Sequence, residues 1–337
     1  MPLALTPEDP SPVRGQTYFS DSSLGNWIKP TGIYIPPGVD FDSGTVDILI
    51  WLHGYYVPGI KQFFSSDPSK VRQAVLASGK EVILVVPYLG NGGVGDASTY
   101  NVSDMDGRWG ENFLRQVLNA LGVGHSARGY IPPWKRNDLS LAGAPQASAM
   151  GTPIGLGNLV IACHSGGGQA MRNLVNSLGT YSRHLAECWG FDCLYGVHAH
   201  PDDASFWYNW VQGGNGRPLY ISFGSSTAEQ SVKLYLMGQG LSNERGARRN
   251  PDGPEMANIE VSLGVASREI GDLMGIDDLL QTTSPRPGHA DPLGGNFVEL
   301  AASNLRKNVH WPKDLMDMHY GIAREGLLTR LKVARYL

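Results

Sequence analysis

The sequence is poor in the features that mark several classes of protein. It has only three cysteines in 337 residues, whereas a small secreted domain relies on an even set for its disulfide framework. No apolar run approaches the ~18 residues that a transmembrane helix needs. There is no basic block and the net charge is −4, so the composition gives no support to nucleic-acid binding. These scarcities count against disulfide-rich, membrane-spanning and nucleic-acid-binding classes.

The N-terminus also lacks the basic and the apolar regions of a signal peptide. A mature secreted chain with an added methionine would look the same, so the localisation is left open, with a cytoplasmic location slightly favoured. Cys188 and Cys193 are close enough in the sequence to pair, but an odd total suits a reducing compartment better. Cys163 falls on a strand that we expect to be buried.

What the sequence does have is enough apolar residues for a large core. Hydrophobic residues make up 42% and charged residues 17%, which rules out global disorder. Two short runs, 46–52 and 81–87, are almost continuously apolar, and a helical pattern at 70–77 separates them. Apolar strands that alternate with helices predict an α/β fold with a mostly parallel central sheet and helices on both faces.

The pattern predicts one α/β domain. Residues 1–45 are rich in Pro, Ser, Gly and Asp, and they are predicted to form an extended segment with a short strand at 32–35. Residues 46–337 form the domain, since no repeat or linker divides them. Within it, residues 122–157 have no clear period and are predicted to be a loop-rich insertion, a candidate lid. Further strands are expected at 159–163, 188–196, 218–223 and 258–263, and helices at 111–121, 169–178, 204–212, 227–240 and from about Tyr320.

A serine stands at the junction of a predicted strand and a predicted helix. The apolar run 159–163 leads to Ser165, three glycines follow, and residues 171–178 then have apolar side chains at the helical period. So tight a turn strains the serine backbone, and only small neighbours such as Gly166 and Gly167 can crowd around it. A phosphate-binding loop is the alternative, but the glycines follow the serine and a P-loop lysine is missing.

This junction resembles the nucleophile elbow, G-x-S-x-G, of lipase-like and esterase-like members of the α/β-hydrolase superfamily. Cys163 stands where the first glycine of that motif sits, so the match is to its second half. The resemblance implies an α/β-hydrolase fold in which Ser165 is the nucleophile of a Ser–His–acid triad. It also implies hydrolysis of a carboxylic ester, small or polymeric, through an acyl-enzyme and without a cofactor.

The triad histidine of that superfamily lies in the loop after the last strand. His319 fits, because a long irregular segment separates it from the strand at 258–263 and the terminal helix is expected to begin just after it. The segment His319–Ile322 also resembles the histidine–aromatic stretch that opens the last helix in many members. His289 and His310, in the same irregular segment, are the alternatives.

The sequence specifies the triad acid least. The usual place, the end of the strand at 218–223, has no carboxylate before Glu229. Some lipases of the fold carry the acid one strand earlier, where Asp192 lies 27 residues after the serine. A lone buried aspartate needs a partner such as an imidazole N–H. We therefore predict Asp192, with Asp202 and Asp203 as alternatives.

The resemblance also implies an oxyanion hole made by two main-chain amides. One is the amide of Gly166, and the other is that of Tyr55 in the turn after the strand at 46–52, where Gly54 lets the backbone come close. His53 is expected to hold this turn and to take no part in the chemistry. The candidate substrate-binding residues are Tyr56, His164 and Trp134.

A second motif, His198-Ala199-His200-Pro201-Asp202-Asp203, resembles the ligand sets of zinc-dependent deacetylases and of metallo-β-lactamase-like hydrolases. Ala204 stands where the deacetylases have glutamate, and the sequence has no His-x-x-His. The interpretation without a metal is a turn that caps the helix at 204–212.

Three alternatives to an esterase remain. They are a zinc-dependent deacetylase using His198, His200 and Asp202, an amidase, peptidase or acyltransferase on the same triad, and a non-catalytic member of the fold. The sequence does not indicate an oligomeric state.

Overall fold

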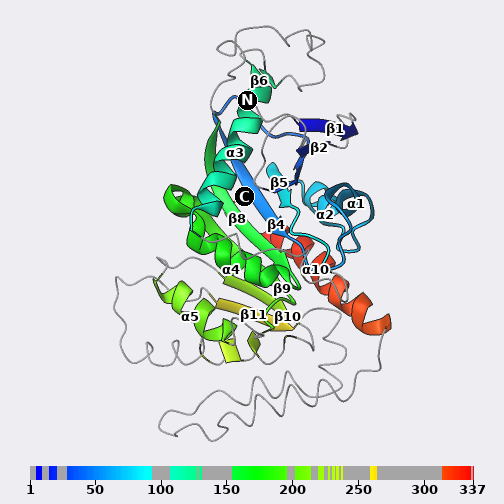
Figure 1. Ribbon diagram of the computed structural model, residues 1–337, viewed down its shortest axis with the longest axis vertical. Coiled ribbons are helices and arrows are strands. Elements are labelled where there is room, and N and C mark those ends of the chain that lie inside the picture. The colour runs from blue at the N-terminus through cyan, green and yellow to red at the C-terminus, as the bar shows by residue number, and fades with distance from the viewer. Residues whose placement is uncertain are drawn as a thin grey trace, which may run out of the picture. The chain divides into compact units, whose positions relative to one another are not determined.

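The computed structural model describes residues 5–9, 15–20, 29–92, 107–126, 129–130, 154–195, 202–213, 219–223, 227, 230–231, 233–234, 237, 259–263, 313–334 and 337 (Figure 1). The chain divides into two compact units. Unit 1 comprises Met1–Ala162, Gln169–Ala186 and Leu328–Leu337, and unit 2 comprises Cys163–Gly168 and Glu187–Leu327.

Unit 1 is built on a sheet whose described strands have the order β1–β2–β3–β5–β4–β8. These strands are β1 (Leu5–Asp9), β2 (Gln16–Ser20), β3 (Thr31–Ile35), β4 (Thr45–Leu52), β5 (Val82–Pro87) and β8 (Gly155–His164). β4 and β5 run parallel, with Ile48 opposite Ile83. Every residue of β5 is buried, as expected for an apolar, β-branched run with both faces covered.

The N-terminal part of unit 1 contains more strands than the sequence predicted. β1 pairs antiparallel with β2, and β2 pairs antiparallel with β3. Only β3 was expected, and the burial of β2 shows why. Thr17, Tyr18 and Phe19 are consecutive and all buried, so β2 lacks the alternation of apolar and polar residues by which a short strand is recognised.

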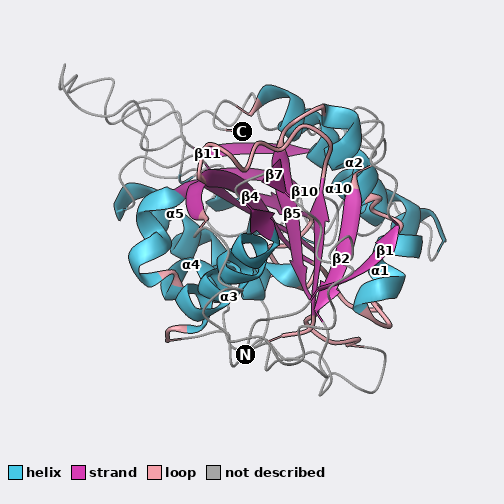
Figure 2. Cartoon of the chain, turned by 90° about the horizontal axis from the view of Figure 1, so that it is seen from above, coloured by secondary structure: helices cyan, strands magenta, loops and turns pink. Residues whose placement is uncertain are grey.

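Helices cover the sheet of unit 1 on two sides. Figure 2 shows α3 and α4 on one side of β4 and β5, and α1 and α2 on the other. The α3–α4 pair approaches closely, since the amide of Gly110 donates to Ser177 Oγ at 3.1 Å and a Cβ at Gly110 would lie 2.8 Å from Leu174. The elements are α1 (Ile60–Ser66), which was not predicted, α2 (Val71–Ser78), α3 (Trp109–Gly124), α4 (Gly167–Ser177) and the 3₁₀ helix η6 (Gly179–His184).

The predicted insertion at 122–157 is described only at its edges. Helix α3 continues to Gly124, β8 already begins at Gly155, and the short strands β6 (His125–Ser126) and β7 (Gly129–Tyr130) pair antiparallel. Residues 127–128 and 131–153 lie outside the described residues, so the lid stays a prediction.

Unit 2 contains a parallel set of strands in the order β9–β10–β11. Strand β9 (Leu185–Phe191) ends earlier than the predicted 188–196, whereas β10 (Leu219–Phe223), β11 (Ile259–Leu263) and helix α5 (Asp203–Gly213) lie close to where they were expected. Residues 227–240 are described only in part, so their prediction as one helix is untested.

The terminal helix α10 (Lys313–Val333) begins earlier than the sequence suggested. We expected it from about Tyr320, with His319 in the loop before it, and this was wrong because His319 lies inside the helix. The sequence carries the signal for the earlier start. Pro312 precedes the first helical residue, and proline favours the beginning of a helix.

The described elements have the predicted α/β architecture, with parallel strands and helices packed against them. After β3, strands and helices largely alternate along the chain. In the sheet, β5 lies between β3 and β4, so the spatial order of β4 and β5 is the reverse of their order in the sequence. Strand β8 leads directly into α4. Among the described residues, the helices are all too short or too polar to cross a membrane.

Candidate active site

The junction between β8 and α4 forms a strained turn centred on Ser165. Ser165 has φ of 56°, a left-handed backbone that residues other than glycine seldom adopt. Two main-chain hydrogen bonds hold it there: the Ser165 amide donates to the carbonyl of Phe191 at 3.1 Å, and the Gly168 amide donates to the carbonyl of Ser165 at 3.1 Å. The turn therefore holds Ser165 in a strained backbone at the end of β8.

A glycine just after Ser165 allows the main chain of the serine turn to lie close to the segment after β9. A Cβ at Gly168 would overlap the main-chain carbonyl of Cys193. Gly166 and Gly167 were expected to be the small neighbours of Ser165, and Gly168 is a third position where a side chain would not fit. Because Cys193 directly follows Asp192, this contact holds the segment of Asp192 against the turn of Ser165.

Asp192 and His319, 127 residues apart in the chain, are brought together. His319 Nδ1 lies 2.5 Å from Asp192 Oδ2, with the imidazole partly exposed and the carboxylate buried. The N–H at Nδ1 donates to the carboxylate, which leaves Nε2 as the acceptor in the neutral ring. This is the tautomer that a general base needs.

The second oxygen of Asp192 is also bound. The hydroxyl of Thr227 donates to Asp192 Oδ1, and both side chains are buried. The main chain of Asp192 is left-handed, with φ of 48°, and its amide donates to the carbonyl of Ser222 at 2.7 Å. The carboxylate is thus oriented by a backbone turn, a hydroxyl and the imidazole, so its burial is compensated.

The helix that carries His319 packs directly on β9, the strand that ends just before Asp192. Gly326 follows His319 by seven residues, two helical turns, so both lie on one face of α10. A Cβ at Gly326 would lie 2.7 Å from Cε1 of Phe191, the residue before Asp192. The missing side chain at Gly326 therefore brings α10 close enough to β9 for the imidazole to reach the carboxylate.

A second histidine supports the first. His164 is buried, and its Nε2–H donates to the main-chain carbonyl of His319 at 3.0 Å. The two rings lie 4.2 Å apart between centroids, and the ring of Tyr320 packs 5.3 Å from that of His164. His164 was a candidate substrate-binding residue, and its contacts suit it to holding His319 in place.

The hydroxyl of Ser165 points to a residue that the sequence analysis did not consider. Its Oγ lies 3.4 Å from the hydroxyl of Tyr195. Within the described part of the chain, Ser165 makes no hydrogen bond to His319. For His319 to accept the serine proton, Ser165 Oγ and the imidazole would have to come closer together, and catalytic hydrogen bonds often tighten only once a substrate is bound.

In unit 1, His53 holds the turn after β4. Its Nδ1–H donates to the carbonyl of Gly54 at 2.7 Å, and its Nε2 accepts the amide of Leu89 at 2.9 Å. Burial lowers the pKa of His53 to about 4, and the bond to Gly54 opposes this only in part. The ring is therefore neutral, and it holds the turn after β4 in place, as expected from the sequence.

The two tyrosines of this turn are exposed, Tyr55 to 42% and Tyr56 to 52%. Tyr56 has φ of 65°, and its amide donates to the carbonyl of Asn91 at 2.5 Å. The amide of Tyr56 is thus already occupied by the main chain. The pairing of Tyr55 with Gly166 in an oxyanion hole stays a prediction, because these residues belong to different units.

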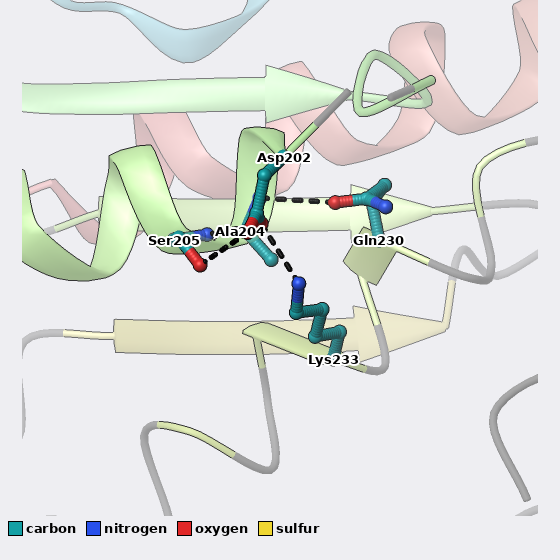
Figure 3. A network of polar contacts seen from close by, with 5 residues as sticks. All are labelled: Asp202, Ala204, Ser205, Gln230 and Lys233. Atoms are coloured by element: carbon teal, nitrogen blue, oxygen red, sulfur yellow. Dashed lines mark hydrogen bonds and ion pairs between the residues drawn. The ribbon is translucent and has the colours of Figure 1, made fainter. Parts of the chain in front are cut away.

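The rival acids have other contacts. Figure 3 shows Asp202 at the start of α5, where it accepts the amide and hydroxyl of Ser205 at 2.9 and 2.7 Å and pairs with Lys233 at 2.9 Å. Partial burial opposes ionisation of Asp202, but these partners outweigh it and lower its pKa to about 2. Its contacts are those of a helix cap. Asp203 is the first residue of α5.

Several other candidates lie outside the described residues: His198, His200, Glu229, His289, His310 and Trp134. Among the residues that are described, His, Cys, Asp and Glu side chains do not gather into a group that could hold a metal ion.

The cysteines do not pair. Cys163, Cys188 and Cys193 are all free and buried, so the considered Cys188–Cys193 disulfide is not formed. A hydrogen bond to Cys163 and burial raise the pKa of the Cys193 thiol. These thiols flank the serine turn and the acid, where they act as small apolar side chains.

No protein-family model and no curated protein matches the chain. Solved structures match it weakly. An S-formylglutathione hydrolase from Agrobacterium tumefaciens is 13% identical over 86% of this chain and 100% of that one, with a TM-score of 0.38. The feruloyl esterase module from Clostridium thermocellum is 15% identical over 69% and 78%, with a TM-score of 0.37. The carboxylesterase EstE1, cloned from a metagenomic library, is 14% identical over 92% and 88%, with a TM-score of 0.30.

Three residues near the site were not predicted from the sequence: Tyr195, Thr227 and Gly326. Gly326 could have been found, because a glycine two turns after a candidate base on a predicted helix indicates close packing on that face. Thr227 and Tyr195 carry no local signal, since their contacts depend on how separate strands are placed.

Proposed function

We propose that the chain hydrolyses carboxylic esters through an acyl-enzyme, with Ser165 as the nucleophile, His319 as the general base and Asp192 as the acid that orients it. The observation that carries the proposal is the bond of 2.5 Å between His319 Nδ1 and Asp192 Oδ2, formed within the unit that also contains the left-handed Ser165. A carboxylate behind an imidazole, beside a serine in a strand-to-helix turn, suits acyl transfer better than metal chemistry.

The reaction divides into two steps that use the same groups. In acylation, Ser165 Oγ attacks the ester carbonyl while His319 Nε2 takes its proton and then passes it to the leaving alcohol. In deacylation, water attacks the acyl-enzyme, its proton goes to His319, and His319 returns it to Ser165 Oγ. Asp192 stays ionised and stabilises the imidazolium that forms in each step.

The negative oxygen that develops in each step needs fixed donors. We assign the amide of Gly166, which follows the nucleophile at the N-terminus of α4, and the amide of Tyr55 as its partner. Tyr56 is proposed to contact the substrate, because its side chain is exposed in the same turn. Trp134 is retained as a substrate-binding candidate from the sequence.

A serine-reactive fluorophosphonate tests the proposal. Intact-mass and peptide mass spectrometry should locate one adduct on Ser165, and Ser165→Ala should lose both the adduct and ~10⁴-fold or more of the p-nitrophenyl ester hydrolysis. EDTA should leave the rate unchanged. A Ser165→Ala protein that keeps its activity, or zinc-restored activity after EDTA, would instead favour the motif at 198–203. Parallel assays with anilides and with acceptor alcohols separate esterase from amidase and acyltransferase activity.

A further inference from the structure

The segment after β9 places a tyrosine beside the proposed nucleophile. Tyr195 follows Asp192 by three residues, and its hydroxyl lies 3.4 Å from Ser165 Oγ. The residues between them, Cys193 and Leu194, are buried. Together with the Cys193 contact at Gly168, this burial fixes the segment on both sides, so the tyrosine is held against the serine by packing.

The geometry points to Tyr195 as a further catalytic residue, whose hydroxyl donates a hydrogen bond to Ser165 Oγ and stabilises the charge that this oxygen carries during the reaction. This inference rests on the function proposed above. Either hydroxyl can donate in the resting structure. In the reactive arrangement the serine proton must point to His319 Nε2, so Tyr195 is left as the donor.

The proton balance requires no additional group. In acylation the serine proton moves to His319, and Tyr195 keeps its own proton while its bond to Oγ shortens. In deacylation Oγ is the leaving group, and the same bond supports its departure until His319 returns the proton. Because the two steps are reverse processes at this atom, the tyrosine should assist both. A phenol is a stronger donor than an aliphatic alcohol, and hydrogen bonds to a developing anion are stronger than neutral ones.

The alternative is that Tyr195 serves the substrate's leaving group, as a donor to the alkoxy oxygen. The two roles differ in a measurable way. A donor to Oγ lowers the barrier by the same amount for every ester, whereas a donor to the leaving oxygen matters most for poor leaving groups. The contact to Oγ favours the first role.

Tyr195→Phe removes the hydroxyl and keeps the ring. We expect kcat/KM for p-nitrophenyl acetate to fall roughly 10- to 50-fold, below the loss for a full oxyanion-hole donor because the contact is longer. The fall should be equal across a series of aryl and alkyl acetates. In stopped-flow experiments both the acylation and the deacylation rate constants should fall, while the midpoint of the pH–rate profile and the melting temperature stay unchanged. Tyr181→Phe, on η6 in unit 1, is the matched control and should behave as the unmodified protein.

The outcomes separate this inference from the proposed function. If Ser165 in the unmodified protein takes no fluorophosphonate, the function itself is wrong. If it is labelled and Tyr195→Phe hydrolyses all esters at the normal rate, only the role of Tyr195 is wrong. A loss confined to esters with poor leaving groups, or to acylation alone, also overturns it.

Discussion

Two histidines, one in each unit, show how the same side chain is directed to different tasks. His319 in unit 2 has a carboxylate at Nδ1, and its ring is partly exposed. His53 in unit 1 is wholly buried, and the main chain occupies both of its ring nitrogens. A general base needs one nitrogen for the substrate side and a negative charge to stabilise its cation. His53 has neither, so it serves as a neutral link between β4 and the turn after β5.

The largest expected effect tests the carboxylate that distinguishes the two histidines. Asp192→Asn should lower kcat by about 10³- to 10⁴-fold, because the amide would stabilise the wrong tautomer of His319. Steady-state kinetics with p-nitrophenyl esters measures it. Asp202→Asn, which alters a helix cap, is the control and should cost less than about tenfold. If Asp202→Asn silences the enzyme and Asp192→Asn does not, the acid is misassigned.

His53 should make stability depend on pH. Its pKa is lowered to about 4 in the folded chain, against ~6.5 when unfolded. Between these values the unfolded state holds the proton and the folded state does not. The contribution of His53 to the free energy of unfolding should therefore fall by roughly 3 kcal/mol as the pH drops from ~6.5 to ~4. Urea titrations across this range measure it. His53→Gln should remove this part of the pH dependence, and an identical slope in the variant would contradict the assignment.

Gly326→Ala tests the packing that brings His319 to Asp192. The new methyl group would meet the ring of Phe191, so α10 must shift or Phe191 must repack, at about 1–3 kcal/mol of stability. Thermal melts measure the loss, and kcat should fall with it because the imidazole moves. Adding Phe191→Leu, which removes the ring, should restore part of both. An active, fully stable Gly326→Ala protein would show that this approach is not required.

The smallest expected effect concerns the buried hydroxyl of Thr227, which donates to Asp192. Thr227→Val keeps the shape of the side chain and removes its bond to Asp192 Oδ1, so kcat should fall roughly tenfold. Thr227→Ser keeps the hydroxyl and should recover most of this rate. Equal rates in the two variants would assign Thr227 to packing alone.

The sequence could predict the parts of the fold that depend on local pattern. Ser165 was recognisable because the strand, the small residues and the helical period all lie within twenty residues of it. β2 was missed because its buried residues are consecutive. The start of α10 was misplaced because the apolar face from Ile322 onward outweighed the proline signal upstream.

The site could be predicted only as far as single residues. The choice of Asp192 over Glu229 rested on strand order and on the need of a buried carboxylate for a partner, and the structure does bring Asp192 to His319. The contacts of Thr227 and Tyr195 depend on loop positions after two different strands, which no local period specifies. The candidate partner amide of Tyr55 depends on how the two units are arranged.

The backbone at Ser165 has a consequence for evolution under heat. A left-handed φ of 56° costs a serine about 1–2 kcal/mol that glycine would not pay. Selection for thermostability alone should therefore replace this serine by glycine, and to a lesser degree the similarly left-handed Asp192. Only continuous selection for turnover would keep both side chains, so their persistence in a heat-adapted lineage would itself record that the reaction is needed.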